Sequence, residues 1–233
     1  YRGWAGVSEE LEWSPELLAF RQSLESLFLD RVRDEVGAFA PTPVTEALPA
    51  VIAAAGGRSL SAYMLERGTI EQFREFAVHR SPYQLKEADP HTWGIPRLSG
   101  EAKAALVEIQ ADEYGGGHSP DVHATLFAGT MRALGLDDAY GAYLDHVPGT
   151  TLATVNLVTL FGLHRRWRGA LIGHLAVFEM TSVVPMGRYS RALRRLGVDA
   201  RARRFYDVHV LADAEHEVIA LHRMAGELAR AEP

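Results

Sequence analysis

The sequence predicts an all-α protein, and three observations support this fold class. Apolar residues recur at intervals of three and four along most of the chain, which is the period of an amphipathic helix. Residue pairs that favour helix starts, such as serine or threonine before proline, alternate with glycines that favour helix ends. The two valine-rich runs that resemble strands, 155–158 and 182–184, are short and lie within helical periodicity. We therefore expect helices throughout and no sheet.

The first half of the chain contains the clearest helix starts. Ser14 before Pro15 begins one helix, and Gly37 is placed to end it. Thr69 begins another, whose inward face carries apolar residues three and four apart. Ser99 begins a long helix that runs into three glycines, which should bend the chain because glycine costs roughly 1 kcal/mol per helical position relative to alanine. The helices expected in this half are 15–37, 43–56, 59–66, one starting at 69, 81–91 and 99–114.

The second half continues in the same way after the glycines. Ser119 before Pro120 begins a helix that extends to Gly135. Further helices are expected at 149–163, 167–185, 187–196 and 200–228. No repeat, low-complexity segment or long linker interrupts them, so we expect residues 1–233 to form a single domain.

Composition narrows the classes of function. Apolar residues make up 47% of the 233 residues and charged residues 23%, a balance typical of globular proteins. The formal charge of −6 argues against a nucleic-acid surface, which usually carries a basic excess. Because the chain has no cysteine, disulfides, thiolate-bound metals and a cysteine nucleophile are excluded. A metal in this protein must therefore bind to histidine, carboxylate or water.

The hydropathy and the first residues of the sequence indicate the cellular compartment in which we expect the protein. No window holds eighteen uncharged apolar residues, so we expect no membrane span. The opening residues, Tyr1 to Trp4, lack the features of a signal peptide. We therefore expect a cytoplasmic protein.

The C-terminal helix holds the sharpest local pattern. His209, Asp213 and His216 are separated by four and three residues, which places them on one face of a helix. Side chains stacked over two turns in this way can bind one metal or reach toward two. The alternative is the solvated polar face of an amphipathic helix.

A second set of candidates flanks the glycine run. Glu113 stands at the end of the long helix and His123 stands ten residues later, close to three helical turns. A continuous or slightly distorted helix would place both side chains on one side. Histidine and carboxylate without cysteine suit iron or manganese, and zinc less distinctively. Alone, His123 could be a buried, hydrogen-bonded histidine, and Asp112 and Glu108 are interpreted as surface acids.

Two further acids complete the set. Glu179 stands within a strongly apolar helix, where a carboxylate should not stay charged without a partner. That partner could be an arginine, Arg188 or Arg165, or it could be a metal. Glu87 precedes Asp89-Pro90 and, judged alone, would be a surface residue.

Together these residues are four carboxylates and three histidines on four helical segments. Helical bundles bind two irons by pointing such residues inward from facing helices. The standard ferritin-like arrangement needs two Glu-x-x-His motifs, and none is present: His118 lies five residues after Glu113, and Ser182 lies three after Glu179. The ordinary ferritin-like bundle is therefore disfavoured.

An ordered set of sequence blocks resembles a known family. The blocks are Lys86–Leu98, Glu108–Gly117, His123–Phe127 with Leu134–Leu136, Glu179, and the three residues of the C-terminal helix. Over about residues 70 to 225 the chain resembles the heme-oxygenase-like di-iron oxidases and oxygenases, often called iron-containing redox enzymes. The resemblance implies a heme-oxygenase-like helical bundle of about seven core helices. It places the metal ligands on Glu87, Glu113, His123, Glu179, His209, Asp213 and His216, a spacing most similar to that of the N-oxygenating branch.

The resemblance also implies a chemistry. Two irons, with O2 as co-substrate and an external electron donor, would react through a peroxo-diferric intermediate. The expected activity is oxygenation of an amine or guanidine nitrogen of a small metabolite in natural-product biosynthesis. The alternatives are oxidative C–C cleavage or decarboxylation of an amino acid or fatty acid, a metal-free enzyme on the same fold with Glu179 as acid or base, and a binding protein. The expected partners are a small-molecule substrate and a reductant, with a homodimer as an option and with neither nucleic acid nor membrane.

Overall fold

The computed structural model describes residues 8–38 and 40–232, and they divide into two compact units. The first unit extends to Thr42 and the second begins at Pro43. Tyr1 to Trp4, whose sequence bears on a signal peptide, lie outside the described residues. One domain over residues 1–233 stays a prediction.

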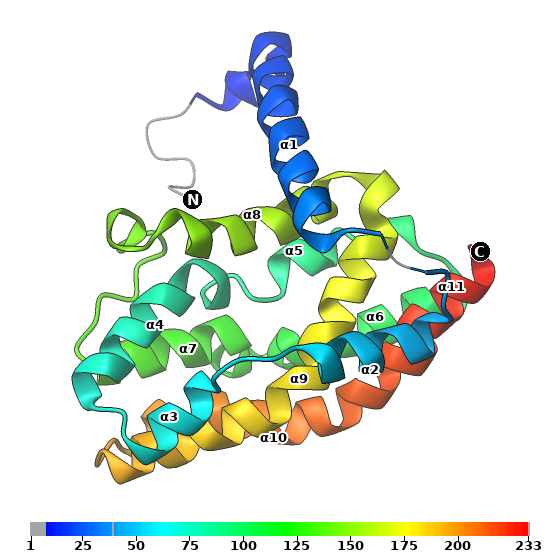
Figure 1. The fold of residues 1–233 in the computed structure, drawn as a ribbon. Coiled ribbons are helices and arrows are strands. Elements are labelled where there is room, and N and C mark those ends of the chain that lie inside the picture. The colour runs from blue at the N-terminus through cyan, green and yellow to red at the C-terminus, as the bar shows by residue number, and fades with distance from the viewer. Residues whose placement is uncertain (1–7, 39, 233) are drawn as a thin grey trace. The chain divides into compact units, whose positions relative to one another are not determined.

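The first unit is built around one long helix. A short 3-10 helix, Glu9–Trp13, precedes α1, Pro15–Val36 (Figure 1). The Ser14 hydroxyl accepts a hydrogen bond from the Leu17 N–H at 3.4 Å, and Gly37 ends the helix with a φ of 70°. Both predicted boundaries are therefore confirmed by a cap at each end.

The second unit holds all the remaining helices. Among the described residues there are only helices, turns and irregular segments, which confirms the all-α prediction. The helices are α2 Val44–Ala54, α3 Leu60–Glu66, α4 Ile70–Gln84, α5 Asp89–Thr92, α6 Gly100–Glu113, α7 His123–Ala133, α8 Gly149–Leu163, α9 Arg168–Arg195, α10 Ala200–Val218, the π-helical segment Ile219–Gly226 and α11 Glu227–Ala231.

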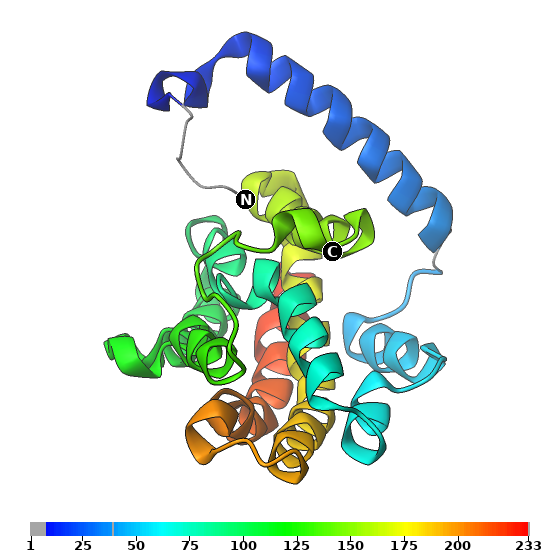
Figure 2. The same cartoon turned by 90° about the vertical axis from the view of Figure 1, so that its left-hand side faces the viewer.

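The long helix α9 is the centre of this unit. It packs along α10 and also contacts α2, α3, α5, α8 and the π-helical segment. Figures 1 and 2 both show α9 in yellow beside the orange α10. The helix pair therefore carries side chains that face most of the other elements.

Two apolar clusters hold these helices in register. One includes Phe73 of α4, Phe127 of α7 and Phe205 of α10. The other includes Ile109 of α6 and Ile172 of α9 together with residues of the π-helical segment. The phenylalanine and isoleucine side chains named here are fully buried, and burial of each stabilises the fold by about 1.5–3 kcal/mol. The helices fixed in this way are those that carry the candidate metal ligands.

Two prolines lie inside helices that the sequence analysis divided. Pro82 was expected near the start of a separate helix, but α4 continues through it to Gln84. Proline cannot donate a hydrogen bond to the Val78 carbonyl, and the Ser81 hydroxyl donates to that carbonyl instead, at 2.8 Å. Pro185 likewise lies within the single helix α9, where two helices were expected. Burial along the rest of each helix outweighs the single missing bond.

Two boundaries also differ from expectation. Ser119–Asp121 forms a 3-10 turn, so the helix expected from Ser119 begins only at His123. The helix expected to continue to 228 changes to π-helical geometry at Ile219. π-Helical segments are uncommon and occur frequently at functional sites.

Within residues 8–38 and 40–232, one helix is long and apolar enough to cross a membrane by length and composition alone. The stretch Arg165–Arg195, which contains α9, includes an 18-residue window with a mean hydropathy of 1.4. This helix contains no uncharged window of that length, because Glu179 lies inside it. A single helix of this kind is weak evidence, since the core helix of a bundle passes the same test. The packing of α9 against α2, α3, α8 and α10 gives it that role here.

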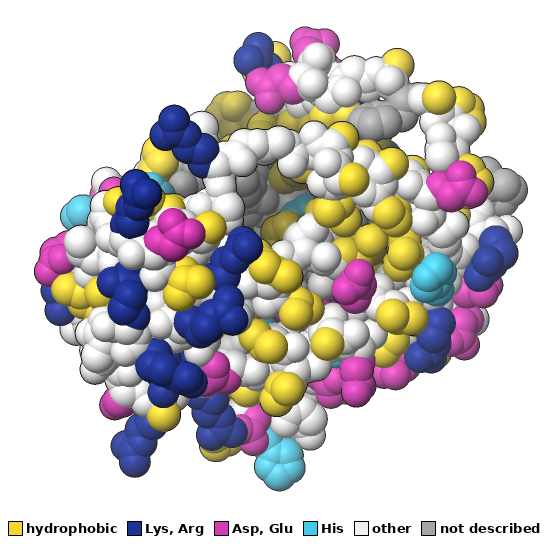
Figure 3. Space-filling view, turned by 60° about the horizontal axis from the view of Figure 1, so that its bottom comes forward, with side chains coloured by type: hydrophobic (Ala, Val, Ile, Leu, Met, Phe, Trp, Pro, Cys, Tyr) yellow, Lys and Arg dark blue, Asp and Glu magenta, His cyan; other side chains and the backbone are white. Residues whose placement is uncertain are grey.

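Charged side chains are unevenly distributed on the face shown in Figure 3. Lys and Arg gather mainly on the left of that view, whereas Asp, Glu and His lie on both sides. This face therefore has a local basic region although the chain carries a net negative charge.

Candidate metal centre

The structure buries all seven residues predicted as metal ligands. Each side chain belongs to a residue that is at most 9% exposed. They come from the turn between α4 and α5, the end of α6, the start of α7, and the facing sides of α9 and α10. The seven residues are Glu87, Glu113, His123, Glu179, His209, Asp213 and His216.

A first group of four residues converges on one point. One potential ligand atom from each of Glu87, Glu113, His123 and His209 lies within 4.8 Å of the others. His123 Nδ1 is 2.8 Å from Glu113 Oε2, and His209 Nε2 is 3.5 Å from Glu87 Oε2. We refer to these four residues as the first group.

The glycine run brings the α6 and α7 ligands together, although not by the predicted route. Glu113 and His123 do not share a continuous helix, because residues 115–117 turn the chain with positive φ angles. Gly115 has a φ of 62°, and a Cβ atom there would lie 2.5 Å from the carbonyl carbon of Asp121. The absence of a side chain therefore allows the close approach that places the start of α7 against the end of α6.

The orientation of His209 leaves one ring nitrogen available. Its Nδ1 lies 2.7 Å from the Phe205 carbonyl oxygen, to which it donates a hydrogen bond. The opposite nitrogen, Nε2, is buried and has no hydrogen-bond partner, and the same holds for Glu87 Oε2 beside it. Metal-binding histidines usually donate their other N–H in this way. The two orphaned atoms therefore fit a bound cation.

A second group shares Glu113 with the first. Ligand atoms of Glu113, Glu179 and His216 also lie within 4.8 Å of one another. His216 Nδ1 is 3.2 Å from Glu179 Oε2, and His216 Nε2 donates to Asp112 Oδ2 at 2.9 Å. We refer to these three residues as the second group.

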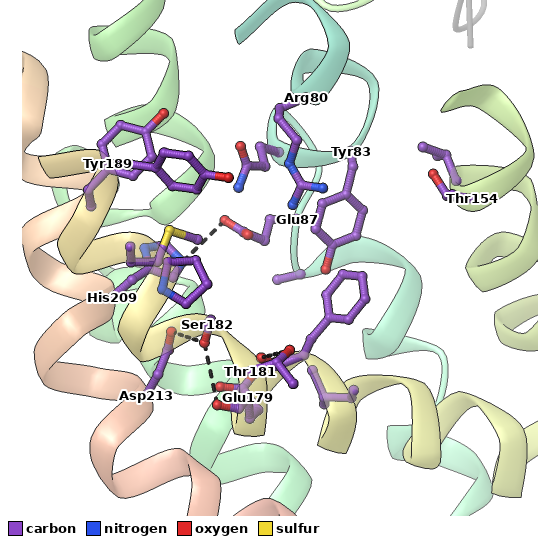
Figure 4. Close-up of a pocket in the computed structure, with 18 of the residues that line it drawn as sticks. Arg80, Tyr83, Glu87, Thr154, Glu179, Thr181, Ser182, Tyr189, His209 and Asp213 are labelled. Carbon is purple, nitrogen blue, oxygen red and sulfur yellow. Dashed lines mark hydrogen bonds and ion pairs between the residues drawn. The ribbon is translucent and has the colours of Figure 1, made fainter. Parts of the chain in front are cut away.

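Asp213 lies beside the second group without being part of it. Its Oδ1 is 3.8 Å from His216 Nδ1, and its Oδ2 accepts a hydrogen bond from the Ser182 hydroxyl. Figure 4 shows Asp213, Ser182 and Glu179 adjoining one another between α9 and α10. The face predicted for His209, Asp213 and His216 therefore points inward, which the solvated alternative would not do.

The contacts of Asp112, Glu179 and Arg188 differ from those expected from the sequence. Asp112 was interpreted as a surface acid, but its side chain, although 62% exposed, binds buried His216. Its place next to Glu113 in sequence gave no signal of this contact. Glu179 is paired with His216 and not with an arginine, and Arg188 bonds instead to the hydroxyls of Ser59 and Ser61.

The electrostatics of the centre reflect an excess of buried carboxylates. Burial lowers the pKa of His209, but the nearby acids, Glu87 above all, together have the larger effect, and the pKa of His209 rises to about 10. Burial also lowers the pKa of His216, but Glu179 and the other nearby acids together have the larger effect there, and the pKa of His216 rises to about 9. Burial raises the pKa of Glu179 to about 7. Without a cation, protons must therefore balance these acids, and a metal would replace them.

The donor set restricts the metal. The two groups offer imidazole nitrogens and carboxylate oxygens and no sulfur. Such a set suits iron and manganese, whereas a tetrahedral thiolate site would suit zinc. The residues present therefore fit an iron centre.

A cavity of about 580 Å³ adjoins the centre. Glu87, Glu113, Glu179, His209 and Asp213 form part of its wall. The rest combines apolar side chains and hydroxyls with two histidines, two glutamines and one arginine, contributed by helices α3 to α6 and α8 to α10 (Figure 4). This size is typical of sites for small molecules, so a substrate could lie directly beside the metal ligands.

Comparisons with known proteins agree with this chemistry. A sequence model of the family described as iron-containing redox enzymes matches residues 74–233, which include all seven candidate ligands. The chain is also 25% identical over 158 residues to the nitrosourea synthase of Streptomyces achromogenes subsp. streptozoticus. The matched region is 68% of this chain and 34% of the relative, so the match spans about a third of that protein's length.

Proposed function

This chain belongs to the family of iron-containing redox enzymes, and from that premise we propose that it is a non-heme di-iron oxygenase. Its substrate is a small metabolite of natural-product biosynthesis that carries an amine or guanidine nitrogen, and the reaction adds oxygen to that nitrogen. An external reductant supplies electrons, and O2 is the co-substrate.

The position of Glu113 carries the proposal. Its carboxylate belongs to both groups, and a carboxylate has two oxygens with which to contact two cations. Glu87, His123 and His209 would hold one iron, and Glu179 and His216 the other. Asp213, next to His216, would complete the second set. Facing helices build carboxylate-bridged di-iron sites in this manner.

The irons would supply the electrons and the open coordination positions that O2 activation requires. The residues of the chain fix the geometry around them. The Phe205 carbonyl holds the His209 ring, and the Asp112 carboxylate holds the His216 ring. The cavity is large enough to hold a small substrate beside the ligands.

One observation favours nitrogen as the atom that is oxidised. The name of the Streptomyces relative, nitrosourea synthase, denotes a product with oxygen bound to nitrogen. Oxidative C–C cleavage forms no N–O bond.

Anaerobic titration with ferrous iron, followed by a pulse of O2, tests the proposal. We expect two irons per chain and a transient visible absorbance band in stopped-flow measurements. His209→Ala should lose the band and about one iron. His222→Ala, which removes an exposed histidine from the same C-terminal stretch, is the matched control and should keep both.

Failure of iron to bind, or a band unaffected by His209→Ala, would contradict the di-iron assignment. Mass spectrometry of the products then separates the two chemistries. N-oxygenation adds about 16 mass units per oxygen, whereas oxidative decarboxylation removes a carboxyl carbon. A product that has lost carbon and gained no N–O bond would favour the alternative reaction.

A further inference from the structure

The end of α9, the turn after it and the start of α10 carry a dense run of arginines. Residues 188–204 include seven arginines and a single acid, Asp199, which gives this segment a formal charge of +6 in a chain of net charge −6. In Figure 3 the basic side chains gather mainly on the left, the side on which Figure 1 places this turn. We refer to the seven arginines as the arginine cluster: Arg188, Arg191, Arg194, Arg195, Arg201, Arg203 and Arg204.

Four members of the cluster make contacts within the fold. Arg188 and Arg195 donate hydrogen bonds to α3 and to the residues that flank it. Arg203 donates to the backbone at the start of its own helix, and Arg204 pairs with Asp121. These contacts account for only part of the positive charge.

The other three members have no role in the fold. Arg191, Arg194 and Arg201 are exposed, and within residues 8–38 and 40–232 they make neither an ion pair nor a hydrogen bond. Like charges that gather in one region repel one another, so free arginines do not stabilise the folded chain. Folding therefore does not explain their accumulation, whereas an anionic partner does.

The cluster is linked to a candidate metal ligand through α10. Arg204 directly precedes Phe205, whose carbonyl oxygen accepts the hydrogen bond from His209 Nδ1 at 2.7 Å. The rings of Phe205 and His209 also pack together, with 4.3 Å between their centroids. A few peptide bonds and one hydrogen bond thus connect the surface at the start of α10 with the first group. An electron that arrives at this surface has a short, continuous route inward.

The second group is linked to the surface in a region of opposite charge. Asp112 of α6, which is 62% exposed, holds His216. The exposed side of α6 also carries Glu101 and Glu108, which share the single cation Arg223. The two routes from the surface to the candidate metal centre therefore begin in a basic and in an acidic region. The charge of a docking protein decides which of them it uses.

An exposed leucine adjoins the arginines of α10. Leu211 is 77% exposed and follows Arg204 by seven residues, or two helical turns, so both lie on one face of the helix. Arg201, three residues before Arg204, extends that face. Arginine is enriched in docking surfaces, whose centres are apolar and whose rims are polar. This face of α10 has that composition.

We propose that the arginine cluster and Leu211 form the docking site of a small acidic protein of the ferredoxin type, which delivers electrons one at a time. Opposite charges accelerate the encounter of two proteins without making the complex permanent. This suits a partner that must bind, give up one electron and leave. The inference rests on the proposed function and identifies the class of its reductant.

The electron count requires two such encounters in each turnover. Addition of one oxygen atom to an amine nitrogen converts an N–H bond into N–O–H, and the second oxygen atom of O2 leaves as water. The reaction takes up two electrons and two protons, so two reduced carriers each lose one electron to the iron pair and solvent supplies the protons. A tightly bound carrier would block the second encounter, so we expect a small, weak interface.

Nucleic acid is another anion that binds to clustered arginines. Outside residues 188–204, however, the chain has a large excess of acids over bases. An extended phosphate backbone would meet that negative charge, whereas a compact acidic protein needs only the local basic region. The observations therefore favour the protein partner, and binding of DNA is an outcome of the test.

The first measurement uses the full chain without metal, so that binding is separated from activity. The probe is an acidic [2Fe–2S] ferredoxin of the plant type, titrated calorimetrically at ionic strengths of about 0.01 M and about 0.1 M. The Debye length shortens between these conditions from roughly 30 Å to roughly 10 Å. We expect a weak complex whose affinity falls about fivefold or more at the higher ionic strength.

Three variants identify the docking site. Arg194→Gln with Arg201→Gln removes two free charges and should weaken ferredoxin binding about tenfold. Arg165→Gln with Arg166→Gln removes two exposed charges just before α9, about 40 Å away along that helix, and is the matched control. Leu211→Gln should weaken binding without altering its dependence on salt, because it removes only apolar contact.

A second measurement follows the delivery of electrons to the iron-loaded, oxidised chain in stopped-flow absorbance. The reductant is either the reduced ferredoxin or a small neutral hydroquinone. Arg194→Gln with Arg201→Gln should slow reduction by ferredoxin about tenfold. Reduction by the hydroquinone should be unchanged, because a small neutral molecule needs no docking face. The control pair should match the wild type with both reductants.

The proposal is overturned if ferredoxin does not bind at low salt, or if the two double variants lose equal affinity. It is also overturned if single-stranded DNA binds to these arginines more tightly than ferredoxin does. A chain that takes up two irons and reacts with O2 after chemical reduction, but ignores ferredoxin, loses only this docking site. A chain that takes up no iron instead refutes the proposed function, whatever protein it binds.

Discussion

The two groups of candidate ligands share Glu113 but differ in what holds their histidines. In the first group, His209 is fixed by the carbonyl of Phe205, a backbone atom inside the bundle. In the second, His216 is fixed by Asp112, a side chain that is 62% exposed. The first site is thus organised entirely by buried structure, whereas the second reaches the surface through one hydrogen bond. We infer that the second site binds its metal more weakly and responds more to its surroundings.

The local backbone strengthens this contrast. His216 lies three residues before the π-helical segment that starts at Ile219, while His209 lies two turns earlier within regular α10. The ring of His209 also packs against Phe205 and His123, with centroid distances of 4.3 Å in both cases. The first site is therefore the more rigid of the two, and a series of variants can separate their properties.

Substitution of the shared residue should have the largest effect. Glu113→Ala removes a ligand atom from both groups and leaves His123 without its carboxylate. We expect iron uptake to fall from two per chain to nearly none, measured by ferrous titration and metal analysis. Glu108→Ala on the same helix, which loses only a surface ion pair with Arg223, should keep both irons. Retention of one tightly bound iron by Glu113→Ala would show that the two sites do not depend on a common ligand.

The bend between α6 and α7 should affect the first site selectively. Gly115 and Gly116 both have positive φ angles, but only at Gly115 would a Cβ atom meet nearby backbone. Gly116→Ala should reduce the free energy of unfolding by about 1–2 kcal/mol, the cost of the left-handed conformation. Gly115→Ala should cost more, because the chain must also move apart at Asp121, and it should weaken iron binding at the first site. Equal losses in urea denaturation for the two variants would contradict this account of the bend.

This bend marks where prediction from sequence succeeded and where it did not. Helical spacing placed His209, Asp213 and His216 on one face, and the apolar sequence around Glu179 indicated a partner for that acid. Both patterns left alternatives open, and only the resemblance named these residues as ligands. The contact between Glu113 and His123 was foreseen, but its geometry was not. Three glycines can bend a chain in many directions, and the direction depends on tertiary packing.

The partners of the ligands were still harder to foresee. Asp112 precedes Glu113 and faces another way on α6, so its sequence position suggests only a surface acid. It reaches His216 because α6 and the end of α10 come together in the folded chain.

Neutralisation of Asp112 should affect the second site alone. Asp112→Asn keeps an oxygen that can accept the hydrogen bond from His216 but removes the negative charge that strengthens it. We expect iron affinity at the second site to fall about tenfold, and that at the first to stay unchanged, in competition titrations with a chelator. Glu108→Gln, a neutralised acid one turn earlier on α6, is the matched control. Equal weakening of both sites would show that Asp112 acts through the general field and not through the His216 ring.

The smallest effect concerns pH, and it distinguishes the metal-free from the iron-loaded protein. In the metal-free protein the pKa of His209 is raised to about 10 and that of His216 to about 9, both above the ordinary 6.5. Their contribution to stability is therefore fully present below pH 6.5 and is lost as pH rises through 9 and 10. Glu179, with its pKa raised from 4.5 to about 7, changes stability in the same direction at lower pH.

The free energy of unfolding of the metal-free protein should thus decrease between pH 6.5 and 10 in urea denaturation. With iron bound, the metal takes the place of these protons, so the decrease should largely disappear and iron affinity should rise with pH. Burial lowers the pKa of His216, and Glu179 raises it more than Asp112 does. Asp112→Asn should therefore reduce, but not remove, the part of the decrease centred near pH 9, and it should leave the part due to His209 unchanged. If Asp112→Asn instead flattened the whole profile, the two histidines would titrate as one unit, and the separation between a buried site and a surface-linked site would not hold.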